Sequence, residues 1–311
     1  MAARGNEVLA WSEQCVIWET EELVAYLDPR PWTPGATVLT RKAGEGGPAS
    51  LFELPVCQYS VLLQGARAVG ELLCQGLGVQ RCALLAYPRP GHPAHAQLLP
   101  LHGLSPCWEP KLAPDIVLQP LDPGYCSSRS GPRAPDAELA RIQAQIRARL
   151  PVPTPPSHVF LGDPADGRLF SRLVRGEEPQ WRVWEDSAHV AFLTPFPHSP
   201  GCTVVVPRRP LSSDLLRLPE SEYGALILCT RQVALLLQEG LDTRGCALVF
   251  EGYEVDYAHA KLYPLIRPPL PPLPPPPEFC PVYPGYVTSV DGPPASAQEL
   301  RELQARLTQC S

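Results

Sequence analysis

The chain is internally repeated: two long segments carry the same apolar and turn residues in the same order. The matching blocks are 16–42 with 182–208, 82–101 with 246–265, and 123–139 with 284–300. Within the first pair, Trp18 corresponds to Trp184 and Ala25 to Ala191. Three blocks in one order indicate an internal duplication, so the fold must accommodate two copies of one unit.

Both copies predict the same succession of elements. Two short strands with alternating apolar residues precede a Pro-Gly turn and a third, β-branched strand. A helix with apolar residues at three-to-four spacing follows at 59–76 and at 222–240, and each ends at a glycine. Two further strands come next, and amphipathic helices close the copies at 136–150 and 297–307. This order predicts α+β units, each an antiparallel sheet with packed helices.

The repeat and the proline distribution set the expected boundaries. The first unit spans 1–150 and the second spans 158–311, with a proline-rich linker at 151–157 that should be stiff because proline restricts φ. A second proline run, 268–277, interrupts the second unit. Its composition is typical of polyproline II, so we expect it to form a surface loop.

Charge and cysteine usage exclude several classes of protein. The net charge is −6 and no Lys/Arg-rich run occurs, which argues against a nucleic-acid partner. The 11 cysteines include no C-x-x-C pair, which argues against a structural zinc site. Every apolar run is too short to span a bilayer. We therefore expect a cytoplasmic protein with reduced thiols, no membrane partner, no metal and no cofactor.

Each copy places one histidine in the middle of its last strand. The sequence at 257–264 is YAHAKLYP, centred on His259, and the sequence at 93–100 is PAHAQLLP, centred on His95. Successive side chains of a strand point to opposite faces, so positions 257, 259 and 261 share one face. The other histidines show no such pattern, and His102 and His198 are expected at the surface.

These blocks resemble the histidine-triad (HIT) superfamily, whose signature is H-φ-H-φ-H-φ-φ-P with φ apolar. In that family the middle histidine attacks the α-phosphate of a nucleotide and forms a covalent nucleotidyl intermediate, while the outer positions hold the phosphate. The resemblance covers about 100 residues of the second copy. It implies catalytic roles for His259 and His95, and phosphate contacts from Lys261 and Tyr257.

The resemblance also implies four nucleotide-binding residues. Asp28 matches the family acid that binds the ribose hydroxyls, and Thr194 holds that place in the second copy. Gln97 resembles the third-position glutamine of the uridylyltransferase and dinucleotide-phosphorylase branch. Asp256, together with Lys261, resembles a branch with the pattern D-H-x-H-x-K.

Both copies depart from the full triad, and two interpretations stay open. The first triad position is Tyr257 in one copy and Pro93 in the other, and the family's glycine-rich phosphate loop is shortened at 251–257. One interpretation is a nucleotide-binding hydrolase or nucleotidyl transferase that acts through His259 on nucleoside phosphates, phosphoramidates or dinucleoside polyphosphates. The other is a catalytically inactive pseudoenzyme that serves as a nucleotide sensor or an interaction scaffold.

The resemblance and the proline run imply an assembly and a partner. HIT proteins usually dimerise side by side, which implies that the two units of this chain pack as an intramolecular pseudo-dimer and that the protein is a monomer. The segment RPPLPPLP, which starts at Arg267 and continues into the Pro268–Pro277 region, resembles a ligand of SH3 or WW domains. A solvent-exposed spacer is the alternative.

Overall fold

The computed structural model describes residues 14–42, 47–152 and 155–309, so part of the expected linker, 153–154, lies outside the described residues. Within these ranges ten strands form one sheet in which every neighbouring pair is antiparallel. The strands are β1 (Val16–Glu19), β2 (Leu23–Leu27), β3 (Thr37–Arg41), β4 (Cys82–Ala86), β5 (His95–Pro100), β6 (Trp181–Glu185), β7 (His189–Leu193), β8 (Thr203–Pro207), β9 (Cys246–Phe250) and β10 (Ala260–Pro264). The predicted α+β class with an antiparallel sheet is confirmed.

The strand order reads the same from either edge of the sheet. It runs β1-β2-β3-β5-β4 and then β9-β10-β8-β7-β6, so each repeat copy supplies five neighbouring strands in the same internal order. The halves join where β4 pairs with β9, with Leu85 opposite Val249. Every residue of β4 and β9 is buried, and both strands are rich in apolar residues. Because the two strands pair with each other, neither copy exposes an unpaired strand edge to solvent here.

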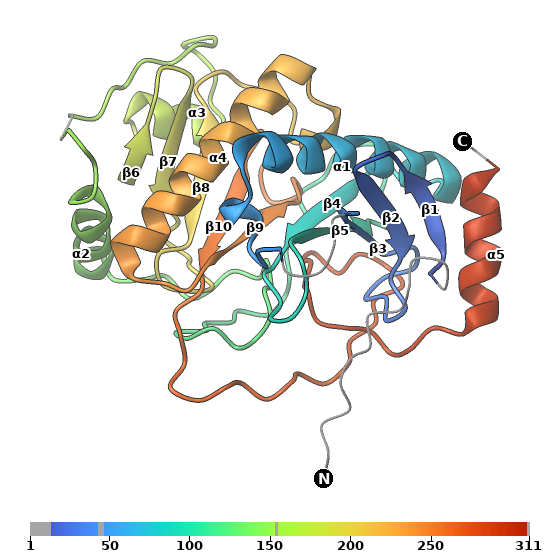
Figure 1. The fold of residues 1–311 in the computed structure, drawn as a ribbon. Helices are drawn as coiled ribbons and strands as arrows, with labels where there is room; N and C mark the ends of the chain where they lie inside the picture. Colours follow the sequence, from blue (N-terminus) through green and yellow to red (C-terminus); the bar gives the residue numbers. More distant parts are fainter. Residues whose placement is uncertain (1–13, 43–46, 153–154, 310–311) are drawn as a thin grey trace.

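Two long helices cross one face of the sheet, as Figure 1 shows for α1 and α4. The helices are α1 (Val56–Leu77), α2 (Asp136–Arg147), α3 (Leu169–Arg175), α4 (Glu220–Leu241) and α5 (Ala297–Thr308), with short 3-10 turns η2 (Leu51–Glu53) and η3 (Leu215–Arg217). The predicted helices at 59–76 and 222–240 are confirmed and begin slightly earlier, after Pro55 and Pro219. None of the helices in the described ranges is long and apolar enough to cross a bilayer.

The contact between α1 and α4 is built from reciprocal hydrogen bonds. Tyr59 and Tyr223 occupy equivalent positions of the two copies, as do Arg67 and Arg231, and each donates to a backbone carbonyl of the other copy. The bonds are Tyr59 Oη to Ile227 O (2.8 Å), Tyr223 Oη to Leu63 O (2.8 Å), Arg67 Nη2 to Leu218 O (2.6 Å) and Arg231 Nη2 to Leu54 O (3.0 Å). The two halves therefore contact each other through the same groups on both sides.

The last helix of each copy lies on the other copy's half of the sheet. Helix α2 packs against α4 and β6, and α5 packs against α1 and β1, so these helices stand beside opposite edges of the sheet (Figure 1). The segments leading to them run close to the opposite copy at two equivalent glycines. A Cβ on Gly131 would lie 1.9 Å from the carbonyl oxygen of Pro197, and one on Gly292 would lie 1.9 Å from that of Pro31. Only glycine allows this approach of two backbones.

Candidate functional site

A pocket of about 330 Å³ opens beneath α3, between that helix, the strands β7, β8 and β10, and the segment 128–133. Its walls are largely aromatic and apolar, with Phe170 and Leu173 from α3, Phe192 from β7 and Trp181 from β6. The pocket has the size and lining that are typical of small-molecule sites. Segment 128–133 belongs to the first copy, so both copies contribute to this pocket.

Two of the residues expected at the site line this pocket. Thr194 lies at the end of β7, and Lys261 points in from β10. The Lys261 ammonium is buried and forms an ion pair with the carboxylate of Glu254. Although burial disfavours the charged ammonium, Glu254 and Glu251 outweigh this effect and raise the pKa of Lys261. Lys261 in turn lowers the pKa of Glu254, so both groups are ionised at neutral pH.

His259 lies directly before β10, with its ring buried at 2% exposure. Its Nδ1 is 2.7 Å from the carbonyl oxygen of Tyr257. Because a carbonyl only accepts, Nδ1 carries the proton and Nε2 keeps its lone pair. Burial, assisted by the nearby charge of Lys261, lowers the pKa of His259 to about 4. The ring is therefore a neutral imidazole at pH 7 with Nε2 as its nucleophilic atom.

The ring of Phe170, on α3, packs against the buried ring of His259. The centroids of these two rings lie 5.3 Å apart, and Phe170 also meets Tyr257 edge-on at 5.7 Å. Tyr257 is fully buried, and its hydroxyl donates to the carbonyl of Pro207 at 2.8 Å. The hydroxyl of Tyr257 is thus bonded to the backbone, and its ring is part of an apolar cluster that includes Phe170.

Asp256 lies apart from the pocket beneath α3. Its side chain is exposed and accepts a 2.7 Å hydrogen bond from the hydroxyl of Ser213. Ser213 in turn accepts from Arg81 of the first copy at 2.9 Å. These contacts join the two copies, and Asp256, Tyr257 and His259 are not among the described residues that line the pocket.

The first copy gathers its three expected residues in the equivalent place. Gln97 donates from Nε2 to Asp28 Oδ2 at 3.4 Å, and burial raises the pKa of Asp28. His95 places Nδ1 2.9 Å from the carbonyl of Pro93, and burial lowers its pKa to about 4. Both copies therefore present a neutral histidine whose Nδ1–H donates to the residue two positions earlier.

Three residues near these sites belong to none of the motifs identified in the sequence. Arg89 lies near Asp28 and His95 and forms a 2.8 Å ion pair with Asp291, which comes from the second copy. Glu254 lies in the shortened loop, where the family pattern supplies no equivalent residue. Phe170 lies on α3, outside the blocks that recur in the two copies.

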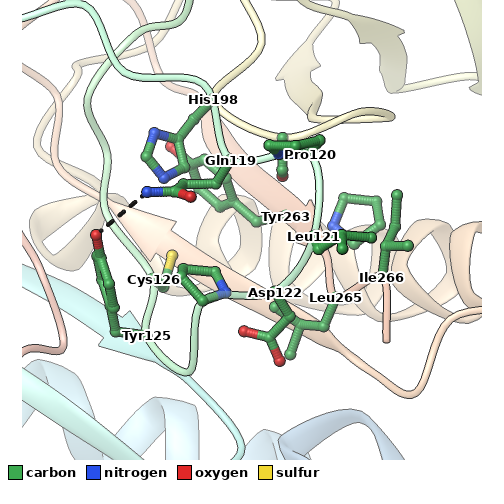
Figure 2. Close-up of a pocket in the computed structure, with 13 residues that line it drawn as sticks. Gln119, Pro120, Leu121, Asp122, Tyr125, Cys126, His198, Tyr263, Leu265 and Ile266 are labelled. Carbon is green, nitrogen blue, oxygen red and sulfur yellow. Dashed lines mark hydrogen bonds between the residues drawn. The ribbon is translucent and has the colours of Figure 1, made fainter. Parts of the chain in front are cut away.

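His198 is buried at 4% exposure, so the expectation of a surface position is wrong. Figure 2 shows its ring beside Tyr263 and Gln119, around a cavity of only about 10 Å³. The segment 119–126 of the first copy covers it, which a prediction from local sequence cannot see. Burial lowers the pKa of His198 to about 4. The other histidine expected at the surface, His102, is half-buried.

Within the described ranges, no three His, Cys, Asp or Glu side chains gather closely enough to hold a metal ion. The cysteines of those ranges are free thiols.

Comparison with known proteins shows which proteins this chain is similar to. No family model matches the chain. An uncharacterised 13.1 kDa HIT-like protein of Mesomycoplasma hyorhinis is 31% identical over 81 residues, which are 26% of this chain and 72% of that protein. An uncharacterised HIT-like protein of Saccharolobus solfataricus is 27% identical over 101 residues, covering 31% of this chain and 72% of the relative.

Among solved structures, a uridylyltransferase mutant aligns with 94% of this chain and 91% of its own, at 12% identity and a TM-score of 0.47. A HIT-like protein of Bartonella henselae aligns with 47% of this chain and 97% of its own, at 19% identity and a TM-score of 0.31. The mycoplasma relative decides the family, because its 31% identity extends over 72% of its length. This chain belongs to the histidine-triad (HIT) family.

Proposed function

We propose that the chain is a nucleotide-binding HIT protein whose working pocket is the one beneath α3, in the second unit. The observation that supports this is the union of three kinds of group in one pocket of about 330 Å³. Phe170, Phe192 and Trp181 offer flat apolar surface to a base, Thr194 offers a hydroxyl to the ribose, and Lys261 offers a cation to phosphate.

In the proposed reaction, His259 attacks the α-phosphorus through Nε2. The N–P bond forms as the bond from phosphorus to the leaving group breaks, and the leaving group departs with that electron pair. Water then displaces His259 and releases the nucleoside monophosphate. The neutral ring supports this role, since a protonated Nε2 would have no lone pair for the attack.

The leaving group must depart without help from a strong acid. The raised pKa of Lys261 makes its ammonium a poor proton donor at neutral pH, and the Tyr257 hydroxyl is already bonded to a carbonyl. Lys261 would therefore act as a fixed charge on the phosphate. A leaving group that is stable as an anion, such as the phosphate chain of a dinucleoside polyphosphate, suits this site better than an amine.

A second candidate function is nucleotide binding without turnover. It is favoured by the pairing of Lys261 with Glu254, because the carboxylate offsets the charge that would otherwise attract phosphate. Such a protein would bind a nucleotide in the pocket without converting it and would act as a sensor or a scaffold.

A thermal-shift series on the full chain tests the binding proposal. AMP, GMP, UMP or a dinucleoside polyphosphate should raise the melting temperature, since a ligand at a hundred times its Kd adds about 2.7 kcal/mol to stability. Lys261→Met should remove most of that rise, and His95→Ala, altered at the equivalent position of the first unit, should keep it. A rise that survives Lys261→Met and disappears with His95→Ala would place the working pocket in the first unit and overturn the assignment.

Trapping distinguishes the two candidate functions. Acid-free quenching with an α-labelled dinucleoside polyphosphate should leave label on the chain through His259, and the label should be absent in His259→Ala. Bound nucleotide with no label and no product would establish the inactive form instead.

We also propose that the units at 1–150 and 158–311 form an intramolecular pseudo-dimer and that the protein is a monomer. The palindromic strand order and the reciprocal bonds between α1 and α4 support this arrangement. Each copy already covers the other's central strand, so neither leaves that edge for a partner chain. Light scattering should give a mass of 34.0 kDa, and twice that mass would contradict the proposal.

A further inference from the structure

The segment 267–277 forms an exposed strip between β10 and the helix α5, in the long loop that runs below the sheet in Figure 1. We call it the proline strip. It takes no part in the pocket beneath α3, since none of its residues lines that pocket. Its two leucines, Leu270 and Leu273, are 76% and 87% exposed, among the most exposed large apolar side chains of the described chain.

The sequence register of the proline strip sorts its side chains onto edges. Polyproline II has three residues per turn, so side chains three positions apart lie on one edge. Leu270 and Leu273 share one such edge after the bend at residues 269–270, and Pro271 and Pro274 share the next; these four residues are exposed, as is Arg267 before the bend.

The strip contacts the body of the protein at a few of its prolines. Pro272 lies against the first copy at Gly124, where an added Cβ would come within 2.9 Å of the proline ring. Pro275, three positions on, is half-buried. The strip is thus partly covered at Pro268 and Pro275, whereas its two Leu-Pro pairs are exposed to solvent.

Two apolar-Pro pairs at this spacing match a known mode of recognition. Leu270-Pro271 and Leu273-Pro274 are three residues apart, and aromatic-lined grooves accept such pairs one turn apart on a polyproline II ligand. Proline limits the conformations available to the free strip, so little entropy is lost when it is bound. An exposed apolar ridge of this kind is otherwise unfavourable in water.

We propose that the proline strip is a docking ligand for a protein domain with SH3-type aromatic grooves. The two apolar-Pro pairs fill two grooves, and an acidic side chain of the domain pairs with Arg267. Arg267 is exposed and carries no ion pair within the described part of the chain. It stands one residue farther from Leu270 than in the usual ligand, an added rise of about 3 Å that its long side chain can span.

Binding of the full chain to a panel of purified SH3 domains tests this proposal. The parent protein should bind at least one domain, and the double variant Leu270→Ala with Leu273→Ala should bind it at least tenfold more weakly. Arg267→Gln should weaken binding severalfold and reduce its dependence on salt. The matched control, Leu118→Ala with Leu121→Ala, changes two exposed leucines outside the strip and should bind like the parent.

Folding of the variants is checked by their melting temperatures, which should equal that of the parent because the changed side chains are exposed. Absence of binding tighter than a Kd of about 1 mM to every SH3 domain would overturn the proposal. So would binding confined to a parallel panel of WW domains, or binding that the double leucine variant leaves unchanged.

Discussion

Replacing Glu185 by glutamine should lower the free energy of unfolding by about 3–5 kcal/mol, because it leaves two buried guanidinium groups without a counter-charge. Glu185 Oε2 accepts from Arg182 at 2.9 Å and from Arg208 at 2.7 Å. The two arginines are 1% and 2% exposed. Burial already lowers the pKa of Arg182, which shows how unfavourable its surroundings are for charge.

The remaining partners of these arginines cannot replace the carboxylate. They are backbone carbonyls, including those of Ser157, Val159 and Val174, and the side chains of Gln180 and His158, none of which carries a negative charge. The cluster holds the segment that carries α3 against the sheet edge. Its loss should therefore also loosen Phe170 over the pocket and reduce the stabilisation by nucleotide.

Urea denaturation measures this effect, with Arg209→Gln as the control. Arg209 pairs with Glu222 at 3.0 Å and is 58% exposed, so its loss should cost less than about 1 kcal/mol. Similar small losses in Glu185→Gln and Arg209→Gln would show that the buried cluster does not depend on its carboxylate.

Acidification should destabilise the protein through three buried histidines. The pKa of His95, His198 and His259 is lowered in each case from 6.5 to about 4, and burial is the main cause. Between those values the unfolded chain binds protons that the folded chain excludes, so stability falls as pH falls through 6.5 towards 4. A shift of this size corresponds to about 3 kcal/mol for each histidine.

Comparison of His198→Gln with the parent isolates one of these contributions. Burial raises the pKa of Asp28 and of Glu251, which opposes the histidine effect, so the parent's pH profile alone is a sum of opposing contributions. The stability deficit of His198→Gln at pH 7 should shrink by about 2 kcal/mol at pH 5, since the variant has no proton to exclude. Unfolding free energies that remain parallel from pH 7 to pH 5 would contradict the prediction.

Local patterns in the sequence anticipated much of the fold. The three-to-four spacing at 59–76 and 222–240 identified α1 and α4, and the alternation around His95 and His259 identified strands β5 and β10. These predictions hold because the periodicity of apolar residues follows from which face of an element is buried. The strand expected at 258–263 begins two residues later, so His259 precedes it.

The partners of the side chains at the site could not be predicted from the periodicity of apolar residues. Lys261 was expected to meet phosphate, and its ion pair with Glu254 depends on how the shortened loop at 251–257 folds back over β10. The hydroxyl of Tyr257 is bonded to Pro207, a residue 50 positions earlier. Side-chain pairing leaves no periodic signal in the sequence, whether the partners are seven residues apart, as Glu254 and Lys261 are, or 50.

The sequence by itself determined that one unit occurs twice, that each unit is an antiparallel α+β element, and that each carries one histidine at the equivalent position of the repeat. Only the tertiary structure decided that α2 and α5 lie on the opposite halves, that His198 is covered by 119–126, and that the pocket beneath α3 takes residues from both copies. The division has a physical reason. Element type depends on neighbours a few residues away, whereas burial, charge pairing and pocket shape depend on contacts that form only when distant segments meet.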